Sequence, residues 1–309
     1  MSTVITTSTK VKKKIVVKKI SDLWIHIIMT IVSCMCILPF ILIFIISISD
    51  EKMVDIQGYS FFPLKFSSAA YTYLFNDSSA IVRAYGITIF VTIVGTTVSL
   101  LIGSMLAYVI SRKDFPLKNI LAFYVFFTML FNGGLVPWFL VYSHILNLND
   151  SFLALIVPNL LLSGFNVLIM RSFFSNNVEV SLIEAAYLDG AGEFRIFLKI
   201  VLPLSLPVLA TIGLFTTLSY WNDWFNSLIF MNNNKNISLQ YLMTKALMNI
   251  QFLKTSQNAT TEMGRIASEM PSETVRMAMA IVGVGPILLA YPFFQKYFIR
   301  GLTIGSVKG

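Results

Sequence analysis

The chain has 309 residues, of which 56% are hydrophobic and only 12% are charged, whereas soluble domains contain about a quarter charged residues. This composition excludes an ordinary soluble domain, and repeated apolar stretches of about 20 residues predict one helical membrane domain. The net charge of +8 does not indicate a nucleic-acid partner, because the Lys and Arg residues flank the apolar stretches instead of forming one basic stripe.

The first apolar stretch follows a basic N-terminal segment. Residues 1–22 contain six lysines, and an uncharged run follows from Leu23 to Ser49. This run is too long for the apolar region of a signal peptide, so we expect a retained anchor with a cytoplasmic N-terminus. Cys34 and Cys36, the two cysteines of the chain, lie in this run too close together for an ordinary disulfide. We interpret them as packing residues.

Further candidate spans follow in chain order, each long enough to cross a hydrocarbon core of about 30 Å at about 1.5 Å per residue. They are 82–111, 119–143, 150–170, 206–231 and 276–299. With the first run, they predict an all-α membrane domain of six transmembrane helices over 23–299, followed by a tail at 300–309. An even number of spans places both termini on one side.

The distribution of basic residues predicts which side that is. The N-terminal segment, the 112–118 and 171–204 loops and the C-terminus together hold 15 of the 23 Lys and Arg residues. Since cytoplasmic loops carry the excess of Lys and Arg, we expect a multi-pass cell-membrane protein with both termini in the cytoplasm.

Two regions on the outer side are less regular. Gly133, Gly134 and Pro137 predict a break in the third span, and either a kink beside a translocation path or close helix packing explains the glycines. The 231–275 loop is polar, so we expect it to be partly disordered. His26 and His144 are isolated, and no metal site is expected.

The 171–204 loop is charged and therefore excluded from the bilayer, yet its pattern is helical. Ser181 and Glu184 form a potential capping box that predicts where a short helix begins. Gly190 permits the positive φ that ends this helix. A second helix is predicted from Glu193 to Leu202, and Pro203 is predicted to end it.

Residues of this loop resemble a known motif. Glu184-Ala185-Ala186, Gly190 and the run Ile200 to Pro203 are spaced as in the EAA motif of permease subunits in binding-protein-dependent ABC importers. The resemblance implies a cytoplasmic coupling helix that docks on an ATP-binding subunit, although Glu179 replaces the proline often found before it. The coupling residues that it implies are Glu184, Ala185, Ala186, Asp189, Gly190, Ile200, Leu202 and Pro203.

The resemblance covers most of the chain. The segments 131–137, 220–225 and 295–309 are similar to the carbohydrate branch of these permeases, most closely to the polysaccharide and aldouronate-type permeases of Gram-positive bacteria. This implies the type I ABC importer permease (MetI-like) fold. It also implies that the C-terminal tail contacts the ATP-binding subunits through Gly305, Ser306, Val307, Lys308 and Gly309.

The energy source is expected to lie outside this chain. The phosphate-binding sequence G-x-x-x-x-G-K-S/T is absent, so no cofactor is expected here, and ATP with Mg would be bound by partner subunits. The resemblance implies a second homologous permease, two cytoplasmic ATP-binding subunits, an extracellular substrate-binding lipoprotein, membrane lipid and an oligosaccharide substrate.

Asp223 has two interpretations. It lies between Trp221 and Trp224, either in an aromatic belt at the membrane interface or beside a sugar path, where aromatic faces and polar groups suit a pyranose. The candidate path residues are Asn132, Gly133, Gly134, Trp221, Asn222, Asp223 and Trp224.

Other functional classes have weaker support. A permease for another solute remains an alternative, and an ion-coupled secondary carrier should show internal repeats and acids at the bilayer midplane. An intramembrane enzyme would need a motif such as H-E-x-x-H or G-x-S-x-G, and both are absent. The sequence therefore predicts a transport subunit and not an enzyme.

Overall fold

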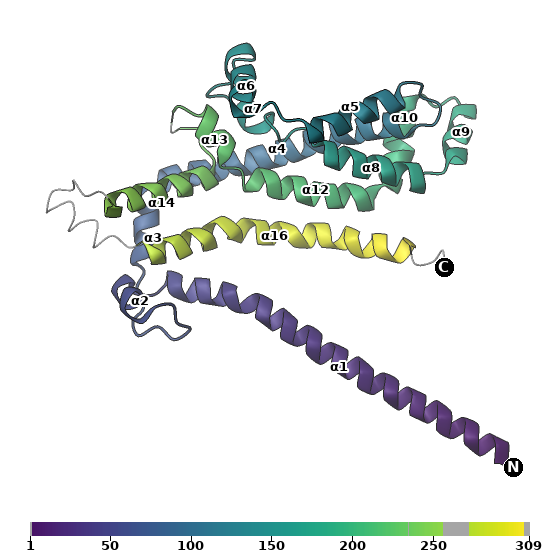
Figure 1. The fold of residues 1–309 in the computed structure, drawn as a ribbon, viewed down its shortest axis with the longest axis horizontal. Helices are drawn as coiled ribbons and strands as arrows, with labels where there is room; N and C mark the ends of the chain where they lie inside the picture. The colour runs from purple at the N-terminus through teal and green to yellow at the C-terminus, as the bar shows by residue number, and fades with distance from the viewer. Residues whose placement is uncertain (1, 234, 256–271, 306–309) are drawn as a thin grey trace. The chain divides into compact units, whose positions relative to one another are not determined.

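A computed structural model (Figure 1) describes residues 2–233, 235–255 and 272–305. The chain divides into two compact units. The first unit comprises Met1–Leu74 and Glu269–Ile281, and the second comprises Phe75–Ser268 and Val282–Gly309. Helix α16 (Glu273–Gly305) contributes its first turns to the first unit and the remainder to the second. Apart from one isolated bridge between Ser49 and Phe66, the regular structure of the described residues is helical.

The first unit contains the long helix α1 (Ser2–Ser47), followed by α2 (Glu51–Gln57) and α3 (Ala69–Leu74). The predicted first span corresponds to the helical stretch Trp24–Ser47, which is long and apolar enough to cross a membrane. Cys34 and Cys36 are free thiols on the exposed surface of α1. Their role as packing residues stays a prediction. A helix so apolar and so exposed requires lipid or a partner around it.

Glu51 caps the start of α16. Its Oε1 accepts the backbone N–H groups of Ser272 at 2.8 Å and Glu273 at 2.9 Å, and its Oε2 accepts the N–H of Thr274 at 2.9 Å. The hydroxyl groups of Ser272 and Thr274 donate to the same carboxylate. The first N–H groups of a helix have no acceptor within the helix, and a negative charge is favoured at this end. The sequence analysis missed this cap, because its partners lie more than 220 residues apart.

Helix α4 (Ser78–Ser111) is the centre of the second unit. The helices that pack along it include α5 (Lys118–Leu130), α7 (Phe152–Ile156), α8 (Gly164–Asn177), α12 (Leu206–Trp221) and α14 (Leu239–Thr255). Figure 1 shows α4, α8 and α12 side by side. One buried cluster surrounds Ala107 and Ile110 near the end of α4, and another surrounds Ile87 and Val91 near its start.

A close approach of two helices fixes the middle of this unit. Gly95 of α4 faces the ring of Tyr220 on α12, where a Cβ atom would overlap the ring. The Tyr220 side chain is only 2% exposed, and its hydroxyl donates to the carbonyl of Ile156 at 2.8 Å. Only glycine at position 95 allows α4 and α12 to pack this closely without displacing the tyrosine.

Some predicted spans are broken in the structure. Among the described residues, Trp24–Ser47 and Ser78–Ser111 are long and apolar enough to cross a membrane. Two bent helix pairs also qualify if each is one span: Lys118–Leu130 with Leu135–Ile145, bent by 117°, and Glu193–Leu204 with Leu206–Trp221, bent by 83°. The break predicted in the third span is confirmed, since α5 ends before Gly133 and α6 (Leu135–Leu140) begins after Gly134. The count of six spans stays a prediction.

The expectation of one continuous helix over 150–170 is wrong. Helix α7 ends at Ile156 and α8 begins at Gly164. Pro158 between them has no backbone N–H to donate, and Asn159 adopts the left-handed conformation with φ 63°. These two residues prevent α7 from continuing, and the next helix, α8, begins only after Ser163.

The segment from α12 to α14 contains more helix than predicted. Helix α12 ends at Trp221, not at residue 231, and the short helix α13 (Phe225–Phe230) follows. The 231–275 loop contains α14, whose Leu239, Met243 and Ile250 are buried. Their helical spacing was present in the sequence, but the surrounding polar residues obscured it. Residues 256–271 of this loop lie outside the described residues.

We predict that Glu51→Gln weakens the start of α16. Burial raises the pKa of Glu51, but hydrogen bonds from Thr274, Glu273 and Ser272 outweigh it, so the net pKa is lowered. A carboxylate with a lowered pKa stabilises the fold above its ordinary value of about 4.3 and loses this effect as the pH falls through the folded-state value. The variant should therefore show a lower midpoint of thermal unfolding at pH 7 and faster amide exchange at residues 273–276.

The matched control is Asp55→Asn, because Asp55 is exposed on the neighbouring helix α2. If both variants unfold at the same temperature and exchange equally, the cap does not stabilise α16.

Candidate functional site

The charged loop after α8 forms a short helix, α9 (Val180–Leu188). It starts one residue before Ser181, with Glu179 in extended conformation as its N-cap and with no capping hydrogen bond from that side chain. The predicted capping box at Ser181 is therefore wrong. Val178 and Ile183 are buried in the same core cluster, and we attribute the helix start to this packing.

Gly190 ends α9 as predicted. Its φ is +77°, in the left-handed region that favours glycine. Its N–H donates to the carbonyl of Tyr187, and the N–H of Ala191 donates to the carbonyl of Ala186, both at 2.9 Å. These two bonds form the Schellman motif. Ala186 and Ala191 also pack against one core cluster, so the turn is held by hydrogen bonds and by packing.

The second helix of the loop continues further than predicted. It comprises α10 (Glu193–Ile196), the π-helical segment η3 (Phe197–Val201) and α11 (Leu202–Leu204). Pro203 does not end it, because helical structure continues to Leu204. The helix ends at Leu204, and the chain bends by 83° into α12.

The predicted coupling residues separate into an outer and an inner group. Ala186, Ile200 and Leu202 are partly buried against the core. The exposed members are Glu184, Ala185, Asp189, Gly190 and Pro203. The sequence analysis did not select Leu188, although its side chain is 90% exposed at the end of α9. An apolar residue directly before the helix-ending Asp189 and Gly190 was the signal that could have identified it.

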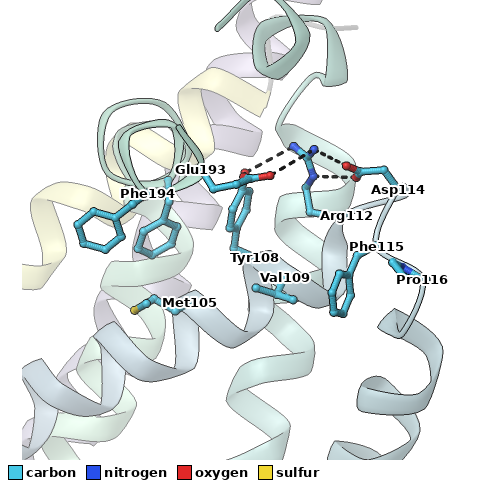
Figure 2. Close-up of a pocket in the computed structure, with 10 residues that line it drawn as sticks. Met105, Tyr108, Val109, Arg112, Asp114, Phe115, Pro116, Glu193 and Phe194 are labelled. Atoms are coloured by element: carbon cyan, nitrogen blue, oxygen red, sulfur yellow. Dashed lines mark hydrogen bonds and ion pairs between the residues drawn. The ribbon is translucent and has the colours of Figure 1, made fainter. Parts of the chain in front are cut away.

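A cluster of charged and aromatic side chains connects this loop to α4 (Figure 2). Arg112 follows α4, and its Nε and Nη2 donate to the two carboxylate oxygens of Asp114 at 2.9 and 2.7 Å. Its Nη2 also lies 3.8 Å from Oε1 of Glu193, the first residue of α10. The Arg112 side chain is only 14% exposed, and the bidentate pair lowers the pKa of Asp114.

Two tyrosines complete this group, which we call the Arg112 cluster. Tyr108 of α4 donates to Oε2 of Glu193 at 2.7 Å, and Tyr187 of α9 donates to Oε1. The Arg112 guanidinium lies 5.9 Å from the Tyr108 ring centroid and 5.5 Å from that of Tyr187, within the range of cation–π attraction. Glu193 therefore accepts hydrogen bonds from α4 and α9 at once, and the two loop helices are joined to the end of α4.

Cavities lie beside this cluster. A cavity of about 410 Å³ is lined mainly by apolar and aromatic side chains that include Met105, Phe115 and Phe197. Figure 2 shows Met105 and Phe115 among its lining residues. A separate cavity of about 590 Å³ lies among the α4–α5 turn, the end of α8 and α9.

The residues proposed for a substrate path occupy different environments. Trp221 is 4% exposed and donates its indole N–H to the carbonyl of Gly283 in α16. Asn222 is exposed, and its side-chain amide donates a hydrogen bond to the backbone carbonyl of Leu218. Oδ1 of Asp223 accepts the N–H groups of Phe225 and Asn226 at 3.2 and 3.3 Å, so this carboxylate caps α13.

An aromatic contact joins α6, which follows Asn132 to Gly134, to α13, which follows Trp221 to Trp224. Asn132 accepts the N–H of Gly134 at 2.9 Å in the turn before α6. Trp138 of α6 then packs against α13, with ring centroids 5.9 Å from Phe225 and 5.0 Å from Phe230. The sequence analysis missed Trp138, whose indole N–H is buried and has no hydrogen-bond partner within the described part of the chain.

The predicted C-terminal contact cannot be placed in the fold. Gly305 is the last residue of α16. Ser306, Val307, Lys308 and Gly309 lie outside the described residues.

Residues 99–304 match the family described as "Binding-protein-dependent transport system inner membrane component". The polygalacturonan/rhamnogalacturonan transport system permease protein YtcP of Bacillus subtilis is 38% identical over 291 residues, covering 94% of this chain and 99% of the relative. The arabinooligosaccharides transport system permease protein AraQ of Halalkalibacterium halodurans is 27% identical over 241 residues, covering 77% of this chain and 78% of the relative.

A solved structure has the same fold. One chain of a bacterial ABC transporter involved in the import of the acidic polysaccharide alginate superimposes with a TM-score of 0.73 at 30% identity, covering 91% of this chain and 97% of that chain. Together with the family match over residues 99–304, this places the chain in the family of binding-protein-dependent transport system inner membrane components.

Proposed function

We propose that this chain is the permease subunit of an ATP-driven importer that takes up oligosaccharides derived from acidic polysaccharides. The names of its relatives support an importer of oligosaccharides or polysaccharides. The acidic class rests on two of them, since a galacturonan is by its name a polymer of a sugar acid and the alginate importer takes an acidic polysaccharide. The chain is a transport subunit and not an enzyme.

The proposed assembly contains this chain and a second homologous permease in the cell membrane of a Gram-positive bacterium, with both termini in the cytoplasm. Two cytoplasmic ATP-binding subunits supply the energy, and an extracellular lipoprotein delivers the sugar. The observation that best supports the coupling role is the loop from α9 to α10, because it combines a fixed turn at Gly190 with an exposed Leu188. A helix whose end is already fixed loses less ordering entropy when a partner docks on it.

Coupling requires that movement of the docked loop reaches the spans. ATP can shift the equilibrium between two permease states only if the ATP-binding subunits hold these states with different affinities. The Arg112 cluster joins α9 and α10 to α4, while η3 and α11 continue into α12. We propose that these two connections transmit the displacement of the loop to α4 and α12, which meet at Gly95 and Tyr220.

The substrate class can be tested with the purified complex in proteoliposomes together with its binding protein. Oligosaccharides of galacturonate or of alginate should stimulate ATP hydrolysis, whereas uncharged arabino-oligosaccharides of equal length should not. Stimulation by the uncharged sugars alone would contradict the acidic class and would favour the substrate that the name of AraQ gives.

We predict that Leu188→Asp separates the permease from its ATP-binding subunits. Because Leu188 is 90% exposed, the substitution removes no internal packing, and membrane insertion should be normal. Co-purification of the ATP-binding subunits should fall about tenfold, as for an apolar anchor at an interface, and uptake should be lost. Gly190→Asp and Glu184→Lys should also abolish uptake without preventing insertion.

Glu179→Gln is the control for this series, because the Glu179 side chain makes no capping bond to α9. Normal uptake in the Leu188, Gly190 and Glu184 variants would overturn the coupling assignment.

Arg112→Lys should uncouple ATP hydrolysis from uptake. Lysine keeps the charge but cannot form the bidentate pair with Asp114. Loss of one charge-assisted bond, about 1.5 kcal/mol, corresponds to about a tenfold fall in uptake, while ATP hydrolysis should stay within about twofold. The measurement is the ratio of sugar imported to ATP hydrolysed in proteoliposomes.

The matched control is Arg195→Gln, since Arg195 is exposed in the same loop. If uptake and hydrolysis fall in parallel in Arg112→Lys, the Arg112 cluster serves folding or docking and does not transmit movement.

A further inference from the structure

The cavity of about 590 Å³ behind α9 has an excess of basic side chains. Its walls come from the α4–α5 turn, the second half of α8 and the side of α9 that faces them. Its charged lining residues are Arg112, Lys113, Lys118, Arg171, Asp114 and Glu184. The lining thus contains four basic residues and two acidic ones, an excess of two positive charges.

The positive charge of this lining is only partly neutralised. Arg112 pairs with Asp114, and Lys118 donates to the uncharged carbonyl of Lys113 at 2.7 Å. Within the described part of the chain, neither Arg171 nor the Lys113 ammonium forms an ion pair. Arg171 is partly buried on α8, and its helix neighbours Met170 and Phe174 are only 1% and 2% exposed. A partly buried guanidinium without a counter-ion is unfavourable, so an anion in the cavity would be stabilising.

The position of these bases indicates where the anion comes from. Lys113 lies two residues after the apolar helix α4 ends at Ser111, and Lys118 begins the apolar helix α5. Lys113 and Lys118 lie on the side of the membrane that has the excess of Lys and Arg residues, which is the expected cytoplasmic side. Basic pockets between spans at this level suit the head groups of anionic phospholipids. The planar fork of Arg171 can bind two phosphate oxygens, and Lys113 adds a point charge.

We propose that this cavity binds the head group of an anionic phospholipid from the cytoplasmic leaflet, with Arg171 and Lys113 as the main phosphate ligands. A lipid source fits better than a free phosphate ion, because the cavity is much larger than one phosphate and lies at the membrane surface. The bound head group joins α8 to the α4–α5 turn on the inner side of α9. It thereby supports the side of α9 that carries Ile183 and Glu184.

The test uses the permease purified with its co-purifying subunits and phosphatidylglycerol as the probe. Retained lipid is measured by native mass spectrometry, and the midpoint of thermal unfolding is measured after addition of phosphatidylglycerol, phosphatidylcholine or inorganic phosphate. The test variant is Arg171→Gln with Lys113→Gln. The control is Arg195→Gln with Lys199→Gln, which removes two exposed loop charges that do not line the cavity.

The wild-type complex and the control should retain phosphatidylglycerol at about tenfold higher occupancy than the test variant. Phosphatidylglycerol alone should raise their unfolding midpoint. If the test variant retains as much phosphatidylglycerol as the wild type, the proposal is overturned. It is also overturned if the control loses as much lipid as the test variant, because the lipid would then be held by the overall positive charge and not by this cavity. A full effect of inorganic phosphate would show a free-anion site and would overturn the lipid source.

If the double glutamine variant does not assemble, Arg171→Lys alone keeps the charge but removes the planar fork, and it should retain less phosphatidylglycerol than the wild type. Equal retention by this variant, in an assembled complex, would also overturn the proposal. No sugar or transport measurement is involved, so the outcome is independent of the proposed substrate.

Discussion

Backbone N–H and C=O groups at the ends of a helix have no partner within that helix, and the need to satisfy them accounts for how the helices of the chain begin and end. At Gly190 the freed groups bond to one another in a Schellman turn. Asn132 accepts an N–H in the turn between α5 and α6, Asp223 caps α13 and Glu51 caps α16. The side chains of Asn132, Asp223 and Glu51 thus each accept N–H groups at a break between helices or at the start of a helix.

The sequence predicted features that depend on local backbone chemistry. Gly190 and the break near Gly133 were predictable, because glycine adopts conformations that other residues avoid. The start of α9 was not, since packing of Val178 and Ile183 against the core replaces the local capping signal at Ser181. The Glu51 cap joins residues distant in the sequence, and no local pattern contains that information.

The proposed coupling depends on a loop that is rigid without being part of a span. Its two helices are short, and isolated helices of this length are unstable in water. Their order comes from tertiary contacts, namely the core behind Ile183 and Ile196 and the Arg112 cluster at Glu193. A partner that docks on this loop therefore meets a surface whose shape is already set, and less ordering entropy is lost on binding.

The exposure of Leu188 has a consequence for the life of the subunit before assembly. Under the proposed function this side chain, which is 90% exposed at the end of α9, is covered only after an ATP-binding subunit has docked. A permease made in excess of its partners would then leave it open to chaperones, to proteases and to other copies of the chain. Synthesis of the subunits in matched amounts would keep such unassembled permease scarce.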